Sequence, residues 1–73
     1  MRLGKYRHYK GNLYQVVGLA LNSDTEEEMV VYKPLYETDV ISKDMFFVRD
    51  KKIFLEEIEV NGKKIPRFEY IGK

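Results

Sequence analysis

His8 is the only histidine in this chain of 73 residues, and histidine is the side chain whose ordinary pKa lies closest to neutrality. It is therefore the one ready acid–base group of the sequence. A catalytic histidine needs a carboxylate to orient it and a nucleophile or a bound water to act on. No spacing places an acid or a hydroxyl beside His8, and the candidates are scattered along the chain (Ser23, Asp24, Ser42, Asp44 and Glu57). We favour a hydrogen-bonded structural role for His8 over a catalytic one.

Two arginines stand in apolar surroundings. Arg49 ends the apolar run of residues 45–48, and Arg67 follows a proline inside another strand-like segment. A guanidinium in such a setting needs an acceptor. One alternative is an ion pair with a nearby acid, for which the sequence offers four glutamates (Glu56, Glu57, Glu59 and Glu69). The other is an anionic ligand, a phosphate or carboxylate held by two parallel hydrogen bonds. The abundance of nearby acids favours the ion pair, and both alternatives stay open.

Tyrosines alternate with basic residues near the N-terminus, in the order Tyr6, Arg7, Tyr9, Lys10 and Tyr14. Such interleaving is the composition of a platform for single-stranded nucleic acid. The alternative is that the tyrosines pack inside while the basic side chains remain in solvent. Nucleic-acid binders of this size carry a strongly basic balance. The near-neutral total charge of this chain therefore favours the second interpretation.

Tyr32 and Tyr36 flank Pro34, which could form an aromatic shelf for a base or a peptide, with core packing as the favoured alternative. The chain has no cysteine and one histidine, which excludes thiolate metal sites and multi-histidine sites within one chain. Glycine-rich phosphate loops and nucleophile elbows are absent. We expect no metal, no cofactor and no catalytic residue.

The charge and hydropathy balance is that of a small globular protein. Thirteen basic and twelve acidic residues leave a net charge of +1, which implies no bulk attraction to nucleic acid or membrane. With 44% hydrophobic and 34% charged residues, the composition is not that of a disordered tail. No apolar run approaches the ~20 residues that span a bilayer, and no apolar segment follows the basic N-terminus. We expect a single domain over residues 1–73, cytoplasmic and without a membrane partner.

The local patterns that position these residues are those of strands. Leu13–Leu21 is a nearly continuous apolar run, which predicts a strand covered on both faces, and Gly18 within it predicts a bulge or a close backbone crossing. Asn61-Gly62 supplies two residues that tolerate positive φ, which is typical of a type I′ hairpin between residues 58–60 and 63–65. Other strands are expected at residues 4–10, 29–35, 45–49 and 66–71, with a possible 3₁₀ turn at 53–55. Without a long helix, these predict an all-β fold, a small barrel of five to six short strands.

Several blocks of the sequence also resemble a known family. Residues 4–11 (GKYRHYKG), 14–18 (YQVVG), 22–26 (NSDTE), 30–32 (VVY), 47–49 (FVR) and 66–68 (PRF) resemble the domain-of-unknown-function family 1653, DUF1653. The resemblance covers essentially the whole chain. It implies a fold similar to a Src-homology-3-type (SH3-like) barrel and a bacterial source, and it leaves the activity open.

Three positions depart from the family pattern, in which histidine is usual at Asn22, tryptophan at Phe47 and proline at Asp50. If two histidines ever formed a working pair, this chain has lost one, which weakens a catalytic or metal-binding interpretation of His8. Phenylalanine keeps a stacking face but has no indole donor. The resemblance therefore favours binding over chemistry.

The leading functional hypothesis is a noncatalytic module that binds an anionic ligand, namely a nucleotide, a nucleic-acid segment or a peptide. Its candidate ligand-binding residues are Tyr6, His8, Tyr9, Tyr32, Arg49 and Arg67. One alternative is a small enzyme in which His8 works with Glu57 or Asp24 as acid–base partner. Another is a structural or regulatory domain that pairs with a partner through an edge strand.

Overall fold

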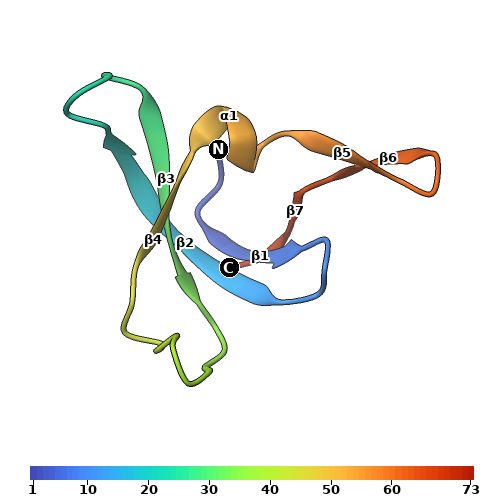
Figure 1. The fold of residues 1–73 in the computed structure, drawn as a ribbon, viewed down its shortest axis with the longest axis horizontal. Helices are drawn as coiled ribbons and strands as arrows, with labels where there is room; N and C mark the ends of the chain where they lie inside the picture. The colour runs from blue at the N-terminus through green and yellow to red at the C-terminus, as the bar shows by residue number, and fades with distance from the viewer.

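The computed structural model describes residues 1–73 and consists of seven strands and one helical turn (Figure 1). The elements are β1 (Gly4–His8), β2 (Leu13–Leu21), β3 (Glu28–Pro34), β4 (Phe47–Asp50), α1 (Lys51–Phe54), β5 (Glu57–Val60), β6 (Lys63–Pro66) and β7 (Phe68–Gly72). The predicted all-β class is confirmed. The turn expected at residues 53–55 is instead a four-residue α-helix that begins two residues earlier. No helix has the length or apolar character needed to cross a membrane.

The strands form two antiparallel sheets and not a closed barrel. Five strands are ordered β4-β3-β2-β1-β7, while β5 and β6 pair only with each other and project as an arm (Figure 1). The prediction of closure therefore does not hold at the level of backbone pairing. The barrel stays open because the turn between β5 and β6 pairs these two strands with each other, which removes them from the main sheet. β4 and β7 consequently remain as edges, each hydrogen-bonded on one side only.

The bulge predicted in β2 is present. The register between β2 and β3 shifts between Val16 and Gly18. A Cβ at Gly18 would meet no atom within 4 Å, so the bulge, and not a close backbone crossing, explains this glycine. The expectation that β2 is covered on both faces is wrong for its second half. Val16 is buried, but the exposed fraction rises from 1% there to 43% at Leu19 and 65% at Leu21, because the long β2–β3 hairpin extends past the core.

The hairpin predicted between residues 58–60 and 63–65 is confirmed, and each of its strands is one residue longer than predicted. Asn61 has φ 52° and Gly62 has φ 78°, the two positive values that a type I′ turn requires. Ile58 pairs with Ile65 across the two strands, and Val60 pairs with Lys63. Local turn chemistry therefore fixes the register of this arm.

The core lies on the concave side of the five-stranded sheet and is largely aromatic. Its seven buried residues are Tyr6, Tyr14, Val16, Val30, Tyr32, Phe54 and Phe68. The rings of Phe54 and Phe68 stack with centroids 4.0 Å apart, whereas the other core rings meet edge to face. Edge-to-face and stacked pairs add to the stabilisation that burial of such large rings provides. α1 matters here because it carries Phe54 into this stack.

Candidate functional site

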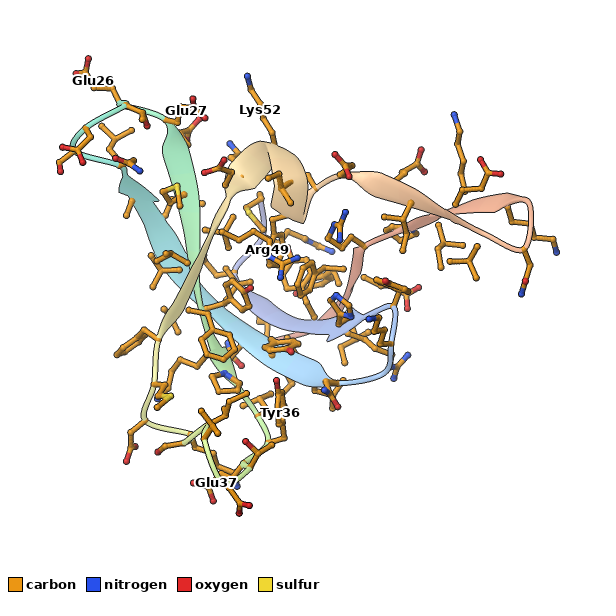
Figure 2. The ribbon with its side chains drawn as sticks, in the orientation of Figure 1. Glu26, Glu27, Tyr36, Glu37, Arg49 and Lys52 are labelled. Carbon is orange, nitrogen blue, oxygen red and sulfur yellow. The ribbon has the colours of Figure 1, made fainter.

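Arg49 occupies the inner face of edge strand β4, where it pairs with Val30 of β3. Figure 2 shows its side chain near the centre of the molecule, in the concave region enclosed by β1, β4 and α1. Its guanidinium carbon lies 5.3 Å from the centre of the Phe68 ring, in cation–π geometry. The molecule has three ion pairs (Arg7–Glu69, Lys51–Glu28 and Arg67–Glu56), and Arg49 belongs to none of them. Arg49 is therefore a partly buried cation without a carboxylate partner.

His8 ends β1 and pairs with Phe68 of β7. Its ring meets the Phe68 ring edge to face, with centroids 4.9 Å apart. The backbone N–H of Lys10 donates a hydrogen bond of 3.2 Å to His8 Nδ1. Burial lowers the pKa of His8, and the positive charges of Arg49, Arg67 and Lys10 lower it further. His8 forms no ion pair, and because its Nδ1 accepts the hydrogen bond from Lys10, the ring proton of the neutral imidazole lies on Nε2.

Arg67 is held by a glutamate, as the first of the two alternatives for the arginines expects. Its Nη2 lies 2.9 Å from Glu56 Oε1, and its backbone N–H donates a hydrogen bond of 3.0 Å to the Glu56 carbonyl. The side chain is 22% exposed, and its Nε is buried without a hydrogen-bond partner. The structure thus separates the two arginines, because Arg67 has its acid inside the fold and Arg49 does not.

The three candidate tyrosines lie in different environments. Tyr6 is 5% exposed and donates its hydroxyl to the Arg2 carbonyl at 2.6 Å, so it belongs to the core. Tyr32 is also buried; burial raises the pKa of Tyr32, and the nearby Arg49 opposes that rise. Tyr9 is 39% exposed, and its ring lies against that of His8 with centroids 4.6 Å apart. Of the three, Tyr9 alone presents its ring to solvent.

A second layer of aromatic residues extends the site. Tyr36, in the segment after β3, points toward β2 in Figure 2, and its hydroxyl lies 2.9 Å from that of Tyr14. Burial and this hydrogen bond raise the pKa of Tyr14. Phe68, the ring beneath Arg49, is not among the residues that the sequence singles out. The two-residue spacing of Phe68 and Tyr70 predicts that both rings lie on the same face of a strand. Only the register between β1 and β7 places Phe68 opposite His8.

The surface has three hollows, and Arg49 lines none of them. The largest, of about 440 Å³, lies between the β2–β3 loop and α1, where Figure 2 labels Glu26, Glu27 and Lys52. A second, of about 280 Å³, includes His8 and Tyr9 together with Glu69. Glu69 pairs with Arg7 at 3.8 Å and forms no ion pair with His8. Arg49 therefore lies outside all three hollows, and His8 and Glu69, which line the same hollow, form no ion pair.

The structure contains no group of three or more histidine, aspartate or glutamate side chains placed to hold a metal ion. The side chains around Arg49 offer three kinds of hydrogen-bond donor. These are the guanidinium of Arg49, the Nε2–H of neutral His8 and the tyrosine hydroxyls around them.

Comparison with known proteins supports the resemblance noted in the sequence. Residues 4–70 match the family model described as "Protein of unknown function (DUF1653)". The chain belongs to the DUF1653 family. A solved crystal structure of a DUF1653 protein from Bordetella bronchiseptica is 38% identical to it, with a TM-score of 0.87. That similarity covers 99% of this DUF1653 chain and 88% of the other. No curated protein matches the chain. The function of this DUF1653 protein must therefore be argued from its own residues.

Proposed function

We propose that this DUF1653 protein is a noncatalytic binding module that holds an anionic oxygen group, a carboxylate or a phosphate, at Arg49. The observation that carries the proposal is the partly buried guanidinium over Phe68, which has no acidic partner within the fold. The matched contrast is Arg67, which lies in similar surroundings and is paired with Glu56 at 2.9 Å.

The surroundings of Arg49 suit an anion. Contact with the Phe68 ring removes part of the hydration of the guanidinium, and cation–π attraction offsets part of that cost. The planar group still presents N–H donors in a fork that matches two oxygens of a carboxylate or phosphate. The positive charges of Arg67 and Lys10, which lower the pKa of His8, also raise the electrostatic potential that an anion meets.

His8 fits this surface as a hydrogen-bond donor. Its Nδ1 accepts from Lys10, so the neutral ring has Nε2–H free to donate to an anion. An acid–base enzyme would need a carboxylate to orient His8, and the neighbouring charges that affect its pKa are all positive. The arrangement therefore supports binding over the alternative of a small enzyme. The expectations of one domain and of a cytoplasmic location stay predictions.

Titration with inorganic phosphate and with acetate tests the proposal. The Nε–Hε signal of Arg49 should shift in NMR spectra, and the melting midpoint should rise with phosphate concentration, because a ligand that binds only the folded state stabilises it. R49M should abolish both effects. R7M is the matched control, because Arg7 carries the same charge on the outer face and pairs with Glu69. Equal loss in R49M and R7M would refute a site at Arg49 and indicate nonspecific attraction.

A further inference from the structure

The strand that carries Arg49 is an edge of the sheet. β4 pairs with β3 through Val30–Arg49 and Val31–Val48, and no strand pairs with its other side. An edge strand presents a row of unpaired backbone N–H and C=O groups, which can accept an additional strand. The anion-binding side chain and a free backbone edge are thus parts of one short segment.

The two faces of β4 differ in chemistry. Arg49 lies on the inner face, whereas Val48 is 61% exposed and the preceding Phe46 is 62% exposed. β4 contains neither lysine nor proline, residues that commonly protect an edge from pairing. An inward-facing charge such as Arg49 disfavours a strand that would place an apolar residue opposite it. The same charge favours a strand that places an acid there.

We propose that the free edge of β4 binds an extended peptide as an added strand, with an acidic side chain of that peptide opposite Arg49. This inference rests on the proposed function, and it names the peptide carboxylate as the anionic group that Arg49 holds. Side chains directly opposite in an antiparallel pair have Cβ atoms about 4.5–5.5 Å apart, within reach of an ion pair. Of the two residues that flank the acid, one would face outward opposite Val48 and the other opposite Asp50. The recognised class is therefore an extended segment in which uncharged residues flank a single acid, and the residue opposite Val48 is apolar.

The other edge of the sheet does not offer this combination. β7 carries Glu69, which pairs with Arg7, and Ile71 on its exposed positions. β7 contains no arginine or lysine. Charge complementarity thus favours β4 over β7 as the edge that takes an acidic strand.

The test uses the full chain labelled with ¹⁵N and a capped heptapeptide, Ser-Thr-Val-Glu-Val-Thr-Ser, with a matched peptide in which glutamine replaces glutamate. The glutamate peptide should shift the amide signals of residues 47–50 and slow their hydrogen exchange, with Kd on the order of 1 mM for so short a segment. The glutamine peptide should bind about tenfold more weakly, because it lacks the charge-assisted hydrogen bonds to Arg49. R49M should bind both peptides equally.

A third peptide, N-methylated at both valines and at the glutamate so that the N–H groups facing either side are blocked, separates this inference from the proposed function. Backbone pairing predicts that N-methylation abolishes the slowed exchange in β4. If the methylated peptide binds as well as its parent, or if no β4 amide responds while acetate still shifts the Arg49 signal, the edge-strand inference is wrong and the anion site stands. If neither acetate nor peptide affects Arg49, both are wrong. A preference for glutamate that survives in R49M would also overturn the inference.

Discussion

The guanidinium of Arg49 lies over the ring of Phe68, although the two residues belong to the opposite edge strands of one five-stranded sheet. This contact shows that the sheet coils far enough for its edges to approach each other through side chains, without a hydrogen-bonded ladder between them. Phe54 of α1 stacks on the same Phe68 ring. The open side of the concave core is thus lined by an arginine and an aromatic stack, which is where we place the anion.

The two arginines should respond differently to removal. R67M should lower the free energy of unfolding by about 1 kcal/mol, because Glu56 loses its partner but is half exposed and stays hydrated. R49M should leave the free energy of unfolding unchanged or raise it, since a group kept for ligand binding adds little to stability. Urea denaturation of both variants measures this. The double change R67M with E56Q should recover much of the R67M loss. A large loss in R49M would indicate a structural role for Arg49.

Gly4 and Gly72 provide a matched pair for a test of backbone packing. Both have φ +136°, which strains any residue with a side chain. A Cβ at Gly4 would lie 2.6 Å from the Gly72 carbonyl oxygen, whereas a Cβ at Gly72 would meet no atom within 4 Å. G4A should therefore lower the free energy of unfolding by roughly 2 kcal/mol more than G72A does. Thermal melts of the two variants decide this, and equal losses would show that β1 and β7 separate readily there.

The hairpin arm should depend on Gly62. Its φ of 78° lies in the left-handed region, and a Cβ at this position would meet no atom within 4 Å, so the cost of substitution is conformational. G62V should cost about 1 kcal/mol or more and lower the melting midpoint by several degrees. K64V is the control, because it introduces the same side chain at an exposed strand position of the same arm. If the two variants melt together, the arm unfolds independently of the rest.

The sequence predicted the features that depend on near neighbours. Asn61-Gly62 specified its turn because two adjacent residues determine that geometry, and Gly18 indicated the bulge for the same reason. Near neighbours could not show whether the barrel closes, because closure depends on pairing between the edge strands β4 and β7, which are far apart in sequence. The exposed end of β2 was likewise misjudged, because apolar residues such as Leu21 do not reveal where the core ends.

The candidate site shows the same division. The sequence identified Arg49 and Arg67 as arginines that need an acceptor, and four glutamates were equally available to each. Only the backbone contact between residues 56 and 67 brings Glu56 to Arg67. Tyr6 was named as a candidate ligand-binding residue, although inward packing was the favoured interpretation, and strand alternation on β1 sends its ring into the core. The partner of Arg67 was thus decided by a contact between residues far apart in sequence, whereas the position of Tyr6 follows from local strand alternation.

His8 should make stability depend on pH in a known direction. The pKa of His8 is lowered in the folded state, so between that value and the ordinary value of about 6.5 the unfolded chain binds more protons. The free energy of unfolding should therefore rise with pH across this window, and stability should fall as pH drops below about 6.5. Urea denaturation from about pH 5 to about pH 8 measures this. The H8F variant keeps an aromatic ring at this position and should lack the pH dependence that His8 causes. If the free energy of unfolding of H8F varied with pH as that of the parent does, this assignment to His8 would be wrong.

The most direct test of anion binding at Arg49 is the NMR titration of the His8 ring, with and without sulfate at constant ionic strength. Sulfate keeps its charge through the titration and would neutralise part of the positive field that lowers the pKa of His8. We predict that sulfate raises this pKa in the parent protein, that R49M raises it without sulfate, and that sulfate has no further effect in R49M. A pKa of His8 that does not respond to sulfate, or a response that persists in R49M, would contradict the proposed site.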